Sequence, residues 1–289
     1  MLLYGLAAIV VLFSILWAVS VRLENSSIVD VAWGPGILAI GLTYYLTGPA
    51  FYFASADGFV LRPHLTLALA ALWAVRLASH LYARMRVLGE DFRYVGWRDR
   101  YEGHWWWISF FKVFLLQAVL AWVVSLPLYF AIVSMSPRPL TFLDYVGIVV
   151  FAAGLVIESV ADEHLRRFRA DRANRGKVLD TGLWRYTRHP NYFGDFCVWW
   201  GLYLIAAAGG AWWTILSPLA MSFLLLRVSG VTLLESDMAE RRPDYRDYQA
   251  RTNAFFPGPP RPNFCRSVSL IRPRSTLRKP STASAPAAR

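Results

Sequence analysis

The chain has 289 residues, of which 56% are hydrophobic and 17% are charged, and its formal net charge is +11. With a mean hydropathy of +0.37, this composition excludes an ordinary soluble domain, because the apolar residues fall in runs longer than a soluble core requires. We therefore expect an all-α integral membrane protein.

Seven apolar stretches come close to the ~20 residues that an α-helix needs to cross the hydrocarbon core. They are residues 2–21, 31–53, 65–81, 108–135, 142–161, 192–208 and 211–234. We predict that they form a multi-pass bundle of about seven transmembrane helices surrounded by membrane lipids. The membrane would be the inner membrane of a bacterium or the endoplasmic reticulum of a eukaryote.

Lys and Arg fall on one side of this predicted bundle. With the N-terminus outside, the inside segments hold Arg22, five Arg in 82–107, eight Lys or Arg in 162–191 and eleven after residue 234. The outside segments hold only Arg62 and Arg138. Because short basic loops stay in the cytoplasm, we predict an outside N-terminus and a cytoplasmic C-terminus. The basic charge then reflects topology, and we expect no nucleic acid partner.

The composition changes at residue 257, which divides the chain into a membrane-embedded domain, 1–256, and a tail, 257–289. The tail is rich in Pro, Ser and Arg and has almost no large apolar residues, so we expect it to be disordered. The sequence contains no GxGxxG, P-loop, GxSxG or HExxH motif and no ligand spacing typical of zinc. We expect no metal site.

The first polar candidates lie where the second and third predicted spans meet the cytoplasm. Asp30 stands at the entrance to the second span. Arg76, His80 and Arg84 recur at a spacing of four where the third span emerges, so they project from one helical face. A histidine in such a place is as often structural as catalytic.

A second group of candidates follows the fifth span. Asp162, Arg166 and Arg169 have helical spacing and come after Glu158, one turn earlier, which predicts a face that carries both acids and bases. The same pattern is typical of a surface helix with ion pairs. Both interpretations stay open.

The sixth span follows the run GLWRYTRHPNYFGD at 182–195. Pro190 suits the first position of a helix, so free N–H groups would lie beside Arg185 and Arg188 and form an anion site. One turn further in, Asn191 and Asp195 share a face, and an acid inside a span is functional by default. The structural alternative is that Arg188 pairs with Asp195 and only holds the bundle together.

After the seventh span, Glu235 precedes a segment in which Tyr245 and Tyr248 alternate with Arg and Asp. This mixture suits stacking on, and pairing with, a planar charged ligand. It equally suits an interfacial helix that lies on lipid headgroups.

The 182–195 run, the Leu-Leu-Glu that ends at Glu235 and the Pro-Asp-Tyr-Arg-Asp-Tyr segment at 243–248 resemble the DUF1295 family of the steroid 5-alpha-reductase superfamily. The resemblance covers nearly the whole chain up to Pro257. It implies a seven-helix fold whose cytoplasmic half holds NADPH. It also implies an oxidoreductase that reduces an activated C=C bond of a steroid-like or other enone lipid.

The resemblance places Asn191 and Asp195 at the Asn and Glu of the reductases' NYFGE motif, which bind the nicotinamide end of the cofactor. Asp162, Arg169 and Arg84 likewise fall on cofactor-binding positions. With the neighbouring basic and aromatic residues, the predicted cofactor site comprises Arg84, Asp162, Arg166, Arg169, Arg185, Arg188, Asn191, Tyr192, Asp195, Glu235, Tyr245 and Tyr248.

The chain departs from the reductases at three places. Their catalytic Tyr is Leu81 here, their Asn one turn before the loop Asp is Glu158, and Arg188-His189-Pro190 replaces Ser-Gly-Ala. The RHPxYxG wording also resembles the isoprenylcysteine and phospholipid methyltransferases, which use S-adenosylmethionine. Those enzymes have a Glu-Glu pair where this chain has Glu235 alone. The third interpretation is a non-enzymatic lipid-binding or transport protein.

Because Leu81 cannot donate a proton to a substrate oxygen, the proton donor must be another residue. We rank Asp30 first, as a buried carboxyl that can stay protonated in an apolar site. His80 comes second and Tyr82 third, since both flank Leu81 on the third span.

Overall fold

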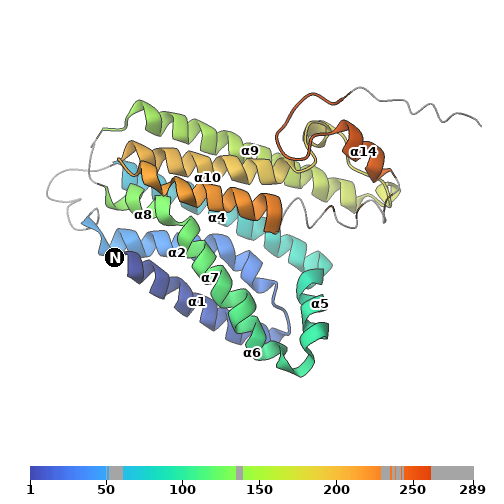
Figure 1. Ribbon diagram of the computed structural model, residues 1–289, viewed down its shortest axis with the longest axis horizontal. Helices are drawn as coiled ribbons and strands as arrows, with labels where there is room; N and C mark the ends of the chain where they lie inside the picture. The colour runs from blue at the N-terminus through green and yellow to red at the C-terminus, as the bar shows by residue number, and fades with distance from the viewer. Residues whose placement is uncertain are drawn as a thin grey trace, which may run out of the picture.

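The computed structural model describes residues 1–49, 51, 61–134, 139–228, 235, 238, 242 and 244–261. In these ranges the chain is helical and has no β-strand, which confirms the predicted all-α class. The long helices lie beside one another in a bundle (Figure 1). The α-helices are α1 (Leu2–Leu23), α2 (Ile28–Thr47), α4 (Leu61–Leu88), α5 (Phe92–Tyr101), α6 (Trp105–Ser109), α7 (Leu116–Val124), α8 (Leu126–Val133), α9 (Phe142–Ala170), α10 (Pro190–Ala208), α11 (Leu216–Phe223) and α14 (Tyr245–Arg251).

Five helical segments are long and apolar enough to cross a membrane: α1, α2, α4, the run Phe92–Val124 and α9. The sixth predicted span corresponds to α10, which has 19 residues and begins at Pro190 as expected. The seventh corresponds to a shorter apolar helix, Trp212–Arg227. Each predicted stretch is therefore helical in its described part, while the sidedness of the bundle stays a prediction.

Two helices run past the ends of the apolar stretches that predicted them. α4 continues seven residues beyond Leu81, to Leu88, and α9 continues nine residues beyond Ala161, to Ala170. Hydropathy marks only the part of a helix that lies in hydrocarbon, whereas the Arg, Leu and Met that follow favour helix as well. As a result, Arg84 and Arg169 stand on rigid helices rather than on loops.

The predicted fourth span is interrupted. A π-helical turn occupies Phe110–Leu115, and α7 ends at Val124, one residue before Ser125, after which α8 begins with Pro127 in its first turn. Proline has no N–H to continue the hydrogen-bond ladder of α7, so the helix axis breaks there.

Glycines bring α9 and α10 into close contact. A Cβ atom added at Gly154 would lie 2.6 Å from the carbonyl oxygen of Gly194, and one added at Gly201 would lie 2.7 Å from that of Gly147. Gly147 and Gly154 are seven residues apart on α9, and Gly194 and Gly201 are seven apart on α10, so the two glycines of each helix lie on one face. Small residues on such a face let membrane helices approach this closely. The polar ends of α9 and α10 are thereby held together.

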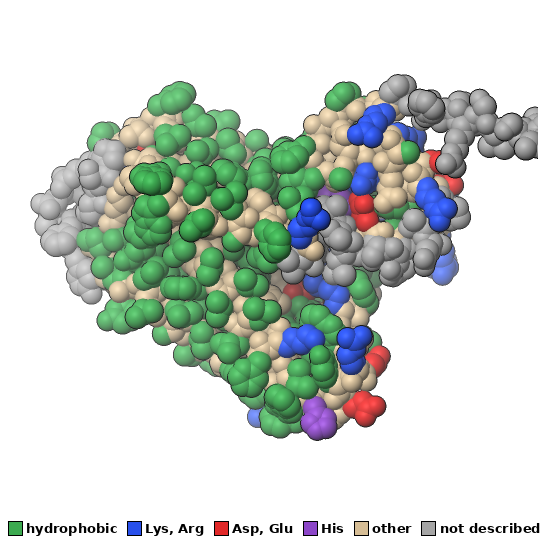
Figure 2. All heavy atoms as spheres, in the orientation of Figure 1, with side chains coloured by type: hydrophobic (Ala, Val, Ile, Leu, Met, Phe, Trp, Pro, Cys, Tyr) green, Lys and Arg blue, Asp and Glu red, His purple; other side chains and the backbone are tan. Residues whose placement is uncertain are grey.

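Charge and hydrophobicity are separated along the molecule. Hydrophobic side chains cover the face of the bundle in Figure 2, whereas Lys, Arg, Asp and Glu gather at the end that carries α5 and α14. Large apolar side chains such as Phe142 (83% exposed) and Val149 (67%) point outward from α9. This surface suits contact with lipid. The proposed domain boundary at 257 stays a prediction, since residues 262–289 lie outside the described part.

Candidate functional site

A polar cluster lies between α4, α9 and α10, just inside the charged end of the bundle. We call it the carboxylate cluster; it comprises Arg76, His80, Glu158, Asp162, Asn191 and Asp195. Arg76 pairs with both Glu158 and Asp162, whose side chains are 4% and 8% exposed. The amide nitrogen of Asn191 donates to Asp162 Oδ1 at 3.0 Å, so α10 joins the pair formed by α4 and α9.

Two further contacts fix the depth of the cluster. The indole N–H of Trp73 donates to Asp195 Oδ1 at 3.1 Å, and the Trp73 ring meets the Trp199 ring edge-on at 5.2 Å. At the other end, His80 Nε2 lies 3.5 Å from Asp162 Oδ2, and its side chain is 27% exposed. Trp73, Arg76 and His80 therefore follow one another at successive turns of α4, from the apolar core toward solvent.

Two acceptors in this cluster have no partner. Glu158 Oε2 and the side-chain oxygen of Asn191 are buried, and no described residue donates a hydrogen bond to either of them. Buried polar atoms without a partner are rare and costly. Each therefore marks a place for a ligand donor, a water molecule or a proton.

Three arginines stand above the carboxylate cluster at the charged end. Arg84 on α4 and Arg242, before α14, both lie close enough to Arg169 at the end of α9 for their positive charges to act on it. We call them the arginine group. Arg84 donates one hydrogen bond to Asp91, and Arg242 donates one to the carbonyl of Lys177. Arg169 makes no hydrogen bond or ion pair with any described residue, so the group retains donors for an anion.

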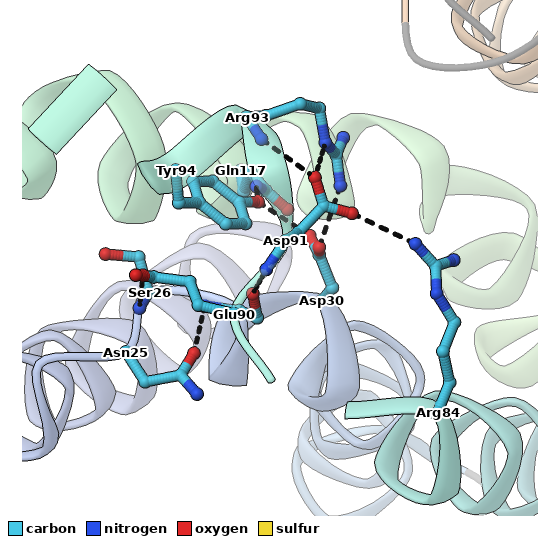
Figure 3. Close-up of polar contacts among 10 residues, drawn as sticks. Asn25, Ser26, Asp30, Arg84, Glu90, Asp91, Arg93, Tyr94 and Gln117 are labelled. Atoms are coloured by element: carbon cyan, nitrogen blue, oxygen red, sulfur yellow. Dashed lines mark hydrogen bonds and ion pairs between the residues drawn. The ribbon is translucent and has the colours of Figure 1, made fainter. Parts of the chain in front are cut away.

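A second network links α2 to α5, as Figure 3 shows. Asp30 accepts hydrogen bonds from the Tyr94 hydroxyl at 2.8 Å and from Arg93 at 3.0 Å, and Gln117 donates to the Tyr94 oxygen at 3.3 Å. The Asp30 oxygens thus accept rather than donate. Arg93 and Tyr94 surround the Asp30 carboxyl group as donors, and the role of Asp30 as a proton donor stays a prediction.

A pocket of about 250 Å³ opens beside this network, with Asp30, Leu81, Arg84 and Asp91 in its wall. Asp91 caps α5 by accepting from the backbone N–H of Arg93, and its other oxygen accepts from Arg84. Burial alone would raise the pKa of Asp91, but the hydrogen bonds and charge of Arg93 outweigh it and hold the pKa below its usual range. The pocket wall therefore carries a fixed negative charge next to Arg84.

The segment before α10 is fastened to α14 by a third group of contacts, which we call the latch. Arg188 donates to both carboxylate oxygens of Glu235, at 2.7 and 3.0 Å, and to the carbonyls of Gln249 and Thr252. His189 Nε2 lies 2.9 Å from Glu235 Oε1. Partial burial would raise the pKa of Glu235, but hydrogen bonds from His189 and Arg188 lower it to about 2.

Tyrosines complete the latch. The Tyr248 hydroxyl donates to the carbonyl of Trp184 at 2.6 Å, and Tyr245 lies beside Glu235 and Arg188. The predicted alternative, an Arg188–Asp195 pair, is wrong, because Arg188 turns toward α14 while Asp195 faces Trp73. The predicted stacking of Tyr245 and Tyr248 on a ligand also lacks support, since both rings are buried.

The structure brings together only some of the predicted site residues. His80, Asp162, Asn191 and Asp195 meet in the carboxylate cluster, and Arg84 and Arg169 belong to the arginine group. Tyr192 stacks on His189 at 5.7 Å, between the cluster and the latch.

Three predicted residues point elsewhere. Tyr82 is 49% exposed and accepts from Arg86. Arg166 has the expected helical spacing from Asp162, but its side chain turns to Glu163 on the exposed side of α9, as in the ion-paired surface helix that was left open. Arg185 is exposed and has no partner among the described residues.

Sequence reasoning missed three participants. Trp73 lies three residues before Arg76 and so continues the stripe of Arg76, His80 and Arg84 on α4, and that signal was available. Tyr94 and Arg242 meet their partners across tens of residues, and no local pattern indicates such contacts.

The sequence profile of DUF1295, described as a protein of unknown function, matches residues 16–252. The chain belongs to the DUF1295 family. DUF1295 is a steroid 5-alpha-reductase-like family, in line with the resemblance noted from the motifs. No solved structure matches the chain.

Two known proteins are similar to the chain. An uncharacterized protein of Schizosaccharomyces pombe is 28% identical over 281 residues, which cover 88% of this chain and 78% of the yeast protein. A probable O-methyltransferase of Ustilaginoidea virens is 36% identical over 63 residues, which cover 22% of each chain.

Proposed function

We propose that this DUF1295 protein is a membrane oxidoreductase that uses NADPH to reduce an activated C=C bond of a hydrophobic substrate. The observation that carries the proposal is the order of charges along one line. Along α4 and α9, Arg84 and Arg169 of the arginine group lie nearer the charged end of the bundle, and the carboxylate cluster, with the unpartnered amide oxygen of Asn191, lies nearer the apolar core. The nicotinamide half of a dinucleotide has the same order, because it runs from the pyrophosphate in the middle of the molecule to a neutral carboxamide at one end.

The residues present fit such a cofactor. Arg84, Arg169 and Arg242 would hold its phosphates, because a guanidinium pairs two phosphate oxygens at once. The unpartnered oxygen of Asn191 would accept a hydrogen bond from the carboxamide N–H₂, which removes the cost of a buried acceptor. When bound, NADPH supplies the hydride. The chain's own part is to orient the reacting groups and to exclude water behind the Trp73–Trp199 pair.

Latch residues take a supporting role in this proposal. Every side-chain hydrogen bond that Arg188 makes with the described residues goes to Glu235 or to a backbone carbonyl of the C-terminal segment. We therefore assign Arg188, Glu235, Tyr245 and Tyr248 to holding the segment that carries Arg242, and the phosphates to the arginine group.

Equilibrium binding to the purified protein in detergent tests the proposal. We expect saturable NADPH binding that weakens about tenfold or more in Arg169→Ala and in Arg242→Ala, since each charge-assisted hydrogen bond contributes ~1.5–3 kcal/mol. The control is Arg166→Ala on the same helix, whose partner Glu163 lies on the exposed side, and it should bind as the wild type does. Equal affinity in all four proteins would contradict the phosphate assignment.

A second candidate is methyl transfer from S-adenosylmethionine. Two observations favour it: the partial similarity to a probable O-methyltransferase, and the excess of acids over Arg76 in the carboxylate cluster, which suits a sulfonium or ammonium group. Saturable binding of S-adenosylmethionine without binding of NADPH would select this function. Binding of neither would select the lipid-binding or transport class.

A further inference from the structure

The carboxylate cluster holds more acid groups than the cations beside them can neutralise. Glu158 is acted on by the charges of Asp195, Arg76 and Asp162, so three carboxyl groups and one guanidinium share this space. His80 adds a positive charge only when it is protonated, and it lies nearest to Asp162. Like charges in a poorly solvated site oppose joint ionisation, so one of the acids keeps its proton.

Hydrogen bonds show which acid that is. Asp162 uses both oxygens, toward Asn191 on one side and toward Arg76 and His80 on the other. Asp195 accepts from the indole N–H of Trp73. Glu158 accepts from Arg76 through one oxygen, and its second oxygen is buried without a donor among the described residues. A proton on this oxygen turns an orphaned acceptor into a donor.

We propose that Glu158 is a neutral carboxylic acid that stores the proton for the buried site, and that Asp162 and His80 return this proton from the solvent-facing end. The inference rests on the proposed reduction, which consumes one hydride and one proton for each C=C bond. Bound NADPH would supply the hydride for one carbon and would be oxidised by two electrons. The O–H bond of Glu158 breaks as its proton bonds to the other carbon, which leaves Glu158 as a carboxylate paired with Arg76.

His80 and Asp162 connect Glu158 to solvent and provide the path by which Glu158 regains its proton. Glu158 and Asp162 are one turn apart on α9, about 5–6 Å along the axis, and Arg76 binds both. His80 stands one turn further out on α4, within 3.5 Å of Asp162, and is partly open to solvent. A proton taken up by His80 therefore passes to Asp162 and on to Glu158, while Arg76 stays charged throughout.

Infrared spectroscopy of the purified wild-type protein tests the neutral acid without any substrate. A protonated carboxyl has its own C=O stretching band, which moves to lower frequency in D₂O. We expect this band at neutral pH, its loss in Glu158→Gln, and its persistence in Asp195→Asn and in the control Glu163→Gln, an exposed acid on the same helix. A wild type without the band overturns the inference, as does a band that survives in Glu158→Gln or disappears in Asp195→Asn.

A kinetic measurement links the acid to the reaction. With NADPH and 4-cholesten-3-one as the probe enone, Glu158→Gln should bind NADPH as the wild type does and lose about a hundredfold in turnover, as expected for loss of a general acid. Wild-type turnover in this variant overturns the inference. NADPH binding without an acid band refutes Glu158 alone. An acid band without NADPH binding refutes the proposed reduction and leaves the neutral acid standing.

Discussion

Arg188 is predicted to hold the C-terminal segment in place through bonds that lysine cannot reproduce. Its guanidinium donates to two oxygens of Glu235 and to the carbonyls of Gln249 and Thr252, at 2.6 to 3.2 Å. Its side chain is 12% exposed and that of Glu235 is 14% exposed, so water replaces these bonds poorly. A single ammonium reaches one side of this arrangement at a time.

We expect Arg188→Ala to weaken the docking of residues 244–261 by about 3 kcal/mol and Arg188→Lys by about half of that, from the worth of hydrogen bonds to charged groups and of a broken, largely buried ion pair. A loss of 3 kcal/mol raises the population of the undocked state about a hundredfold. The expected loss is local, because the bundle helices do not depend on the latch.

Amide hydrogen exchange measured by mass spectrometry reports this directly. The backbone N–H of Gly258 donates to the carbonyl of Tyr186, which lies outside the segment, so this amide exchanges when the segment undocks. The control is Arg185→Ala, three residues earlier, where the side chain is exposed and has no described partner. If Arg188→Ala and Arg185→Ala show the same exchange, the latch contributes nothing and the reasoning is wrong.

Three further predictions concern the pins of the fold. Asp144→Ala removes the carboxylate that the fully buried Arg62 binds through two hydrogen bonds of 2.8 Å. We expect the free energy of unfolding to fall by ~3–5 kcal/mol, measured as a lower thermal midpoint in detergent, and to change little in the exposed control Glu163→Ala. The pKa of Glu235 falls from 4.5 to about 2 on folding, so the ionised Glu235 stabilises the latch fully above pH 4.5 and loses this effect as the pH drops toward 2. Amide exchange of Gly258, corrected for its intrinsic pH dependence, should therefore accelerate between pH 4.5 and about 2 in the wild type and not in Glu235→Gln. Gly154→Val should force α9 from the Gly194 carbonyl and abolish NADPH binding, whereas Val156→Ala on the exposed side should not.

Sequence patterns predicted the faces of helices well and their partners poorly. The apolar stretches and Pro190 located the helices, since hydropathy and a fixed φ act through local chemistry. The spacing of His80 and Arg84 placed both on one face of α4, because a helix repeats every 3.6 residues. Periodicity says nothing about what that face meets, so the contact of Asp30 with Tyr94, 64 residues away, had no signal.

Long side chains account for the errors in the candidate site. Arg166 has the correct spacing to share a face with Asp162, but its flexible stem lets it reach Glu163, which is nearer and exposed. Arg188 likewise bypasses Asp195 for Glu235, which lies 47 residues away in the sequence. Short side chains such as Asn191 and Asp195 stay where their backbone places them, on α10 as the spacing predicted, and their role in binding a cofactor stays a prediction.

The separation of charge along the site limits what it can bind, whichever chemistry it performs. An anionic ligand end is stabilised at Arg84, Arg169 and Arg242, and would be repelled one or two turns deeper, where acids outnumber the guanidinium of Arg76. The anionic group of a ligand is therefore held at the arginine group, and the neutral or donor-bearing end of the ligand reaches Asn191. NADPH and S-adenosylmethionine place different groups at that depth, a carboxamide in one and a cation in the other. The protonation state of Glu158 bears on this difference. With Asp162, Asp195 and Arg76 charged, a neutral Glu158 leaves an excess of one negative charge, whereas an ionised Glu158 leaves two and suits a sulfonium better.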